Sequence, residues 1–205
     1  MVRAHRHFYI VLLSILSAVF VWSAIDPVDR LTWALEVAPV VIVLPILVVT
    51  YRYFVFTPLV YVLILIHALI LMVGGHYTYA EVPWFNWLRD AYELSRNYYD
   101  RLGHFAQGFV PAMVAREILL KKSPLVPGRW LFFIVSCICL SISAVYEFIE
   151  WWVAAYEGGA ADAFLGTQGD IWDTQWDMLM ALVGAVTAQA FLSTFHDRQI
   201  INVSR

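Results

Sequence analysis

The sequence predicts an all-α, polytopic membrane protein, a bundle of six transmembrane helices with both termini in the cytoplasm. Of its 205 residues, 61% are hydrophobic and 14% are charged, a balance too apolar for an ordinary soluble domain. Six apolar stretches each have about the 20 residues that a helix needs to cross a bilayer. The charged residues between these stretches divide unequally between the two sides of the predicted membrane.

The six predicted spans follow one another through short connections, except for one longer segment. They cover about residues 8–25, 33–51, 55–74, 103–120, 130–154 and 176–195. The spans and connections use nearly the whole length, so we expect a single integral-membrane domain over 1–205 without a soluble appendage. The basic N-terminus and first apolar run have the charge pattern of a signal peptide. That run is too long for one, so we expect it to be retained as the first span.

Basic and acidic residues fall on opposite sides when the connections alternate across the membrane. Nine of the thirteen lysines and arginines lie on the side of the termini, namely Arg3, Arg6, Arg52, Arg116, Lys121, Lys122, Arg129, Arg198 and Arg205. Fourteen of the sixteen acids lie on the other side, and only Glu117 and Asp197 join the basic residues. An excess of Lys and Arg marks cytoplasmic loops, so the acidic side is predicted to be external. The loops are too sparsely basic for nucleic-acid binding, and the expected partner is the lipid bilayer.

The first three spans have the composition of a scaffold, with one ionisable exception. Pro39, Pro45 and Pro58 are tolerated in membrane helices whose neighbours satisfy the freed backbone groups. His67 lies deep in the third span. It is either a functional group or a neutral imidazole that is bonded to a neighbouring hydroxyl.

The longest connection, residues 75–102, predicts a short helix in the membrane interface. Its apolar and aromatic residues recur at near-helical spacing, as at Trp84, Trp87, Leu88 and Ala91. Trp and Tyr favour the level of the lipid headgroups. This helix is therefore expected to anchor the protein rather than to carry chemistry.

Polar residues gather at the predicted external ends of spans four and five. Asp100 and His104 are one helical turn apart at the start of span four, so the carboxylate can orient the imidazole or share a cation with it. Glu147 and Glu150 share a face near the end of span five. An ExxE pair is a common way to offer two carboxylates to a metal from one helix, and also a common coincidence.

A third polar group precedes span six. Asp170, Asp173 and Asp177 follow Gly166 and Gly169, which allow an unusual backbone path. If the ends of the last three spans converge, their carboxylates repel one another unless protons, an arginine or a metal cation neutralise them. The competing interpretation is that acids at helix starts interact with the helix dipole beside an ordinary aromatic belt.

The side-chain chemistry favours a divalent metal such as Zn²⁺, Mg²⁺, Mn²⁺ or Ca²⁺, because oxygen ligands with one or two imidazoles suit these ions. The predicted ligands are His104, Glu147, Glu150 and Asp177, with Asp100 as a further ligand or as support for one, and His76 as the second imidazole. Asp170 or Asp173 is expected to act as general base, and Arg101 as a clamp for an anion.

Three functions are compatible with this pattern. The leading hypothesis is a metal-dependent membrane enzyme that acts on a lipid or lipid-linked headgroup at the external face. The second is a small proton- or cation-coupled transporter that uses His67 and the same carboxylates. The third is an assembly or sensing protein whose external acids form a docking face.

Three motifs carry a resemblance to a known family. They are Asp100-Arg-Leu-Gly-His-Phe105, Tyr146-Glu-Phe-Ile-Glu-Trp151 and Gly166-Thr-Gln-Gly-Asp-Ile-Trp-Asp-Thr-Gln-Trp-Asp177. With these motifs the sequence resembles the YjdF-like family of bacterial inner-membrane proteins, over almost the whole chain. The resemblance implies multi-pass residence in the inner membrane and assigns no catalytic role to any residue.

Overall fold

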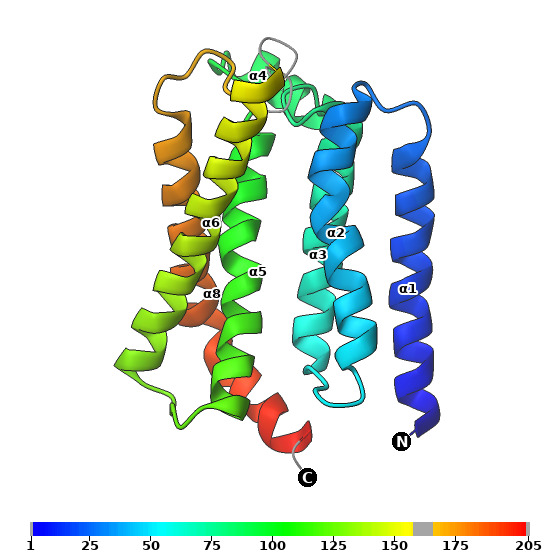
Figure 1. Ribbon diagram of the computed structural model, residues 1–205, viewed down its shortest axis with the longest axis vertical. Coiled ribbons are helices and arrows are strands. Elements are labelled where there is room, and N and C mark those ends of the chain that lie inside the picture. Colours follow the sequence, from blue (N-terminus) through cyan, green and yellow to red (C-terminus); the bar gives the residue numbers. More distant parts are fainter. Residues whose placement is uncertain (1, 158–165, 204–205) are drawn as a thin grey trace.

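The computed structural model describes residues 2–157 and 166–203, and the side chains of residues 6–156 and 166–201. Within these ranges all regular structure is helical, as Figure 1 shows. The helices are α1 (Val2–Ala24), α2 (Arg30–Thr50), α3 (Pro58–Tyr77), α4 (Pro83–Ala91), α5 (Tyr99–Lys122), α6 (Arg129–Glu157) and α8 (Asp173–Val203). A helix therefore stands at each of the six predicted spans. The predicted position of Arg205 lies outside the described residues.

Five of these helices, α1, α2, α3, α6 and α8, are long and apolar enough to cross a membrane. The helix α5 has 24 residues but does not reach the same apolar composition. Its polar side chains are turned toward the other helices, since Asp100, Arg101, His104, Arg116 and Glu117 are all buried. The all-helical, multi-pass prediction is confirmed, and the structure accounts for the weak apolar signal of α5 by burial of its polar face.

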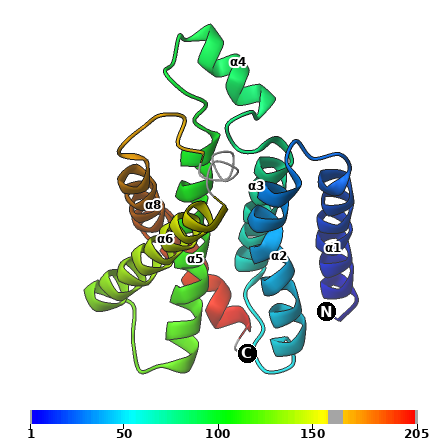
Figure 2. The ribbon, with the colours of Figure 1, turned by 45° about the horizontal axis from the view of Figure 1, so that its top comes forward.

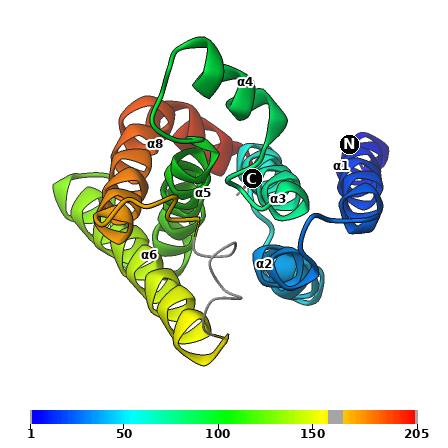
Figure 3. The ribbon, with the colours of Figure 1, turned by 90° about the horizontal axis from the view of Figure 1, so that it is seen from above.

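The helices form two groups that meet along α3 and α5. Seen from above in Figure 3, α1, α2 and α3 lie on one side, and α5, α6 and α8 lie on the other. The beginning of α1 and the end of α8 lie at the same end of the bundle (Figure 1). We call this the inner end and the opposite one, beside α4, the outer end, following the predicted orientation.

The backbones of α5 and α8 touch directly, which sets the geometry of the outer end. A Cβ atom added to Gly108 would collide with the carbonyl group of Ala181, and one added to Gly184 would collide with that of Phe105. Small residues allow this close approach between membrane helices. Below it, an apolar core that includes Val60, Val110 and Val135 joins α3, α5, α6 and α8. The outer turns of α5 and α8 are thereby held side by side.

The short helix α4 confirms the prediction of a helix within the 75–102 connection. Figure 2 shows it lying across the outer end, away from the long helices. None of its residues is buried, and Trp84 and Trp87 expose 66% and 56% of their surface. Its exposed tryptophans suit the headgroup level of a bilayer.

Candidate functional site

The outer ends of α5, α6 and α8 bring together most of the predicted site residues. Each of the six most buried ones exposes between 2% and 7% of its surface: Asp100, His104, Glu147, Glu150, Asp173 and Asp177. Asp170 joins them at the rim, with 29% of its side chain exposed. The predicted convergence of these helix ends is therefore present, and we call these seven residues the outer cluster.

His104 occupies the centre of the outer cluster. Its Nε2 atom lies 3.5 Å from Asp100 Oδ1 and 3.7 Å from Asp177 Oδ1. Its Nδ1 atom lies 3.9 Å from Glu147 Oε1 and 3.2 Å from the amide oxygen of Gln107. Two sets of three ligand atoms, each within 4.8 Å of one another, share this imidazole: Asp100–His104–Asp177 and His104–Glu147–Glu150. Either set is compact enough to converge on one metal ion.

The two sets differ in how their negative charge is neutralised. Arg101 forms an ion pair with Asp177, and its Nη2 atom lies 2.6 Å from Asp173 Oδ1 and 3.2 Å from Asp170 Oδ2. Glu147 and Glu150 have no arginine or lysine partner among the described residues. Glu147 Oε1 is buried and has no hydrogen-bond donor there. An unpaired buried carboxylate oxygen is costly, so this half of the outer cluster has the chemistry of an open cation site.

Arg96 belongs to the same end of the molecule, although its sequence position suggested only an external loop. Its Nη1 atom lies 2.5 Å from Asp173 Oδ1, and its Nη2 atom lies 3.4 Å from Asp100 Oδ2 and 2.9 Å from the Gly166 carbonyl oxygen. Asp173 is thus held between two arginines. The available signal was the spacing of four residues between Arg96 and Asp100.

Paired amides hold the segment before α8 in place. The Gln168 side-chain oxygen accepts a hydrogen bond of 2.9 Å from the Asn97 backbone N–H. The Gln168 side-chain nitrogen donates one of 2.9 Å to the Asn97 backbone carbonyl oxygen. Positive φ angles of 60° at Gly166 and 84° at Gly169 turn the chain there, as the predicted role of these glycines required. The contacts position Asp170 and Asp173 against Arg101.

A carboxyl group from α2 also reaches this region. Glu36 is 4% exposed, and its Oε2 atom accepts a hydrogen bond of 3.0 Å from the Tyr146 hydroxyl. The Tyr146 ring in turn lies edge-on to His104, with 6.2 Å between ring centroids. Sequence reasoning missed Glu36 as a member of the site, and the signal was a lone acid within an apolar span.

Tyr79 fills the space between α3 and α5 beside these groups. A Cβ atom at Gly74 or Gly103 would collide with its ring. Burial, together with the negative charge of Glu36, raises the pKa of Tyr79 well above its ordinary value. The phenol therefore keeps its proton at neutral pH.

Two other predicted histidines lie elsewhere. The Nδ1 atom of His76 is 3.1 Å from the Ser23 carbonyl oxygen, and its ring packs on Trp22 with 4.5 Å between centroids. His76 is therefore not brought to the outer cluster. His67 is half-buried within α3, and its buried Nε2 atom has no hydrogen-bond partner in the described part of the chain.

A second polar cluster lies at the inner end and consists of Glu117, Lys121, His196, Arg116, Asp197 and Thr57. The Glu117 carboxylate accepts from Thr57, Lys121 and His196 at distances between 2.6 and 3.2 Å. Arg116 lies 2.7 Å from Asp197 Oδ1 and donates to His196 Nδ1 at 3.1 Å. The Nδ1 atom of His196 therefore accepts a hydrogen bond, and its Nε2 atom donates one. This inner cluster is balanced in charge and has its hydrogen bonds satisfied.

Comparison with known proteins identifies the family. The family model described as "Predicted membrane protein (DUF2238)" matches residues 8–198. The chain belongs to this family. The inner membrane protein YjdF of Escherichia coli (strain K12) is 52% identical over 185 residues, which is 90% of this chain and 88% of that protein. No solved structure matches the chain.

Family membership confirms the resemblance that the three motifs carry. An inner-membrane relative and five helices able to cross a bilayer also confirm the predicted location, a multi-pass protein of the inner membrane. All three motifs that define the resemblance contribute to the outer cluster. Family membership assigns no activity to the cluster.

Proposed function

We propose that the outer cluster binds a divalent cation and that the protein is a metal-dependent enzyme acting on a lipid or lipid-linked headgroup at the external face of the inner membrane. The observation that carries this proposal is the buried Glu147 Oε1 atom, which lies beside His104 and has no hydrogen-bond donor among the described residues. A cation bound by His104, Glu147 and Glu150 would supply the missing partner.

The two sides of the His104 ring suggest a division of roles. Its Nδ1 side faces Glu147, where no arginine competes, and its Nε2 side faces Asp100 and Asp177. Metal-bound histidines commonly donate their other N–H to a carboxylate, which orients the ring and raises its basicity. We therefore assign the ion to the Nδ1 side, with Asp100 and Asp177 as supports. An ion in the other set would compete with Arg101 for Asp177.

The remaining polar groups fit hydrolytic chemistry. A cation at this position would polarise a phosphoryl or acyl oxygen and activate water. Asp170 is the more accessible of the two proposed general bases, because Asp173 lies between Arg96 and Arg101. Arg101 orients the carboxylates of α8 and acts on an anionic group only if one of these ion pairs opens.

The same proposal includes a membrane topology. We count α5 as the sixth span, since its polar face is buried among other helices, and place the inner end in the cytoplasm. Basic residues at the inner end support this orientation: Arg52 follows α2, Lys121 and Lys122 end α5, and Arg129 begins α6. Residues 1–205 then form one integral-membrane domain.

A cation- or proton-coupled transporter is the second candidate. One observation favours it: the Nε2 atom of His67, deep in α3, is buried without a described partner. Unsatisfied ionisable groups within membrane spans mark transport pathways in many carriers.

Elemental analysis of the purified full-length protein tests the metal site. The parent, loaded with Zn²⁺ or Mn²⁺ and then desalted, should retain about one ion per chain, and Glu147→Gln and His104→Ala should retain none. His67→Ala is the matched control, because it removes a half-buried histidine outside the cluster and should leave the metal content unchanged. Equal metal in all four proteins, or none in the parent, would remove the proposal.

A further inference from the structure

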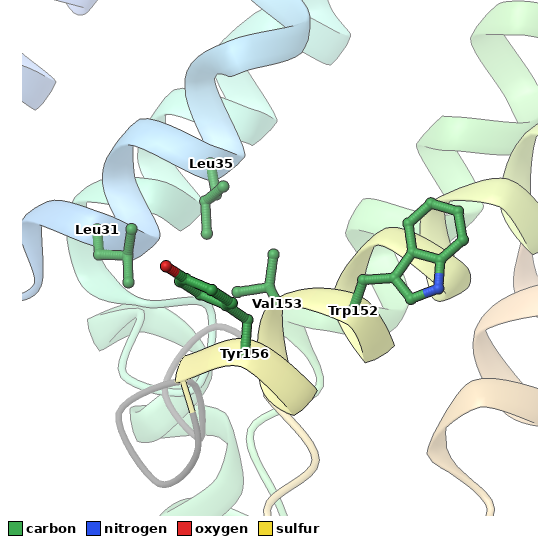
Figure 4. Close-up of a pocket in the computed structure, with 5 residues that line it drawn as sticks. All are labelled: Leu31, Leu35, Trp152, Val153 and Tyr156. Atoms are coloured by element: carbon green, nitrogen blue, oxygen red, sulfur yellow. The ribbon is translucent and has the colours of Figure 1, made fainter.

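An apolar groove opens beside the outer cluster, between the outer ends of α2 and α6. It has a volume of about 280 Å³ and is lined by Leu31, Leu35, Trp152, Val153 and Tyr156 (Figure 4). The two helices have little direct packing with each other, since α2 packs on α3 while α6 packs on α5 and α8. In a bilayer, an apolar groove at the edge of a membrane domain is accessible to lipid.

Two buried carboxyl groups stand next to this groove. Glu36 directly follows Leu35 on α2, and Glu150 lies one helical turn before Val153 on α6. Neither forms an ion pair with a basic side chain in the part of the chain that the structure describes. A positively charged ligand in the groove would therefore stabilise the ionised form of these two carboxyl groups.

The surplus of acid extends over the whole outer end. Among the described residues, Glu36 and the six acids of the outer cluster face two arginines, Arg96 and Arg101, which both pair with Asp173, and one imidazole, that of His104. A divalent cation would reduce the surplus without removing it. A ligand that brings another positive charge therefore suits this surface better than a purely anionic one.

The rim of the groove has the same preference. Trp152 and Tyr156 expose 60% and 88% of their surface. Aromatic faces attract ammonium groups, and these two side chains also favour the level of lipid headgroups. Apolar walls, an aromatic rim and adjoining carboxyl groups together describe a ligand with a hydrocarbon part and an amine.

We propose that the groove binds a membrane lipid with a zwitterionic, amine-bearing headgroup. The glycerol and upper chain region packs on Leu31, Leu35 and Val153, and the ammonium group faces Glu150 and Glu36. Such a lipid would be the substrate class of the proposed enzyme. The inference rests on the proposed function in one respect, the contact between the headgroup phosphate and the metal. Recognition of the amine does not require the ion.

Photo-crosslinking of the full-length protein in lipid nanodiscs tests the inference. The probes are phosphatidylethanolamine and phosphatidylglycerol that carry the same photoreactive group in the same upper-chain position. The ethanolamine lipid should label residues 31–35 and 152–156 about tenfold more than the glycerol lipid, because only the former offers a charged donor to buried carboxyl groups. Equal labelling by the two lipids, or labelling outside the groove only, would overturn the inference.

Three variants separate this result from a change in folding or in metal binding. Leu35→Trp fills the groove and should abolish labelling there, whereas Val41→Trp, at a site on the same helix that is 54% exposed, should not. Glu36→Gln, at a carboxyl group that is not a proposed metal ligand, should reduce the preference for the amine while labelling of the groove persists. Metal content is measured on the same samples. If the protein prefers the ethanolamine lipid but binds no metal, the lipid site is supported and the proposed enzyme is rejected. If it binds metal but shows no lipid preference, only the lipid site is rejected.

Discussion

The two ends of the bundle both bury charged side chains, but they neutralise them differently. At the inner end, Glu117 receives donors from three residues, and Arg116 is paired with Asp197. At the outer end, acids outnumber arginines, and the Glu147 Oε1 atom has no described donor. Buried charge in a membrane protein therefore does not by itself mark a functional site. A balanced cluster fastens helices together, whereas an unbalanced one calls for a ligand.

The largest expected effect comes from breaking the balanced inner cluster. Glu117→Ala leaves the donors of Thr57, Lys121 and His196 without their acceptor, so we expect the free energy of unfolding to fall by about 3–5 kcal/mol. Thermal unfolding in detergent measures the change. A variant as stable as the parent would show that the inner cluster does not fasten α3, α5 and α8 together.

Arg96→Gln should be the next most disruptive change. It removes the positive partner of Asp173 and Asp100 and of the Gly166 carbonyl oxygen, which we expect to cost about 3 kcal/mol, since it leaves buried carboxylates with less neutralisation. Arg89→Gln is the matched control, because the ion pair that Arg89 forms in the described structure is with the exposed Asp90. Equal losses of stability in the two variants would contradict the role given to Arg96.

Replacement of Glu147 should show the opposite sign from replacement of Glu117. Glu147→Gln removes a buried carboxylate that no described lysine or arginine pairs and whose Oε1 atom has no described donor, so without metal its unfolding temperature should equal or exceed that of the parent. With the ion at about one hundred times its dissociation constant, the parent should gain about 2.7 kcal/mol and the variant nothing. The same thermal unfolding assay, with and without Zn²⁺ or Mn²⁺, provides the comparison. If the variant without metal unfolds at a much lower temperature than the parent, Glu147 stabilises the fold and is not an open cation ligand.

Tyr146→Phe should have the smallest effect. It deletes one hydrogen bond, to Glu36, and retains the ring against His104, so we expect a loss of about 1 kcal/mol with unchanged metal content. Loss of the metal in this variant would show that the α2 side of the site takes part in binding the ion.

The sequence was most informative about features that lie within one helix. The lengths of the apolar stretches located the six long helices of the described structure. The spacing of Asp100 and His104 correctly placed both residues on one face of a helix. The positions of the helices relative to each other depend on contacts such as Gly108 against Ala181, which have no signature in a single sequence. The predicted convergence of α5, α6 and α8 needed the structure to establish it.

The residues that sequence reasoning missed or misplaced show the same limit. Arg96 lies in a connection, and only the fold brings it between Asp173 and Asp100. Glu36 lies in an apolar span, and its link to the site runs through a tyrosine on another helix. His76 was expected at the site as a second imidazole, but the fold turns it toward Ser23 and Trp22.

The most direct test is to locate the ion. Anomalous diffraction from crystals of the protein prepared with Zn²⁺ or Mn²⁺ should show one strong peak bounded by His104 Nδ1 and the carboxylates of Glu147 and Glu150. A peak elsewhere in metal-loaded crystals, or density for those three side chains with no ion between them, would contradict the assignment of the outer cluster as a metal centre.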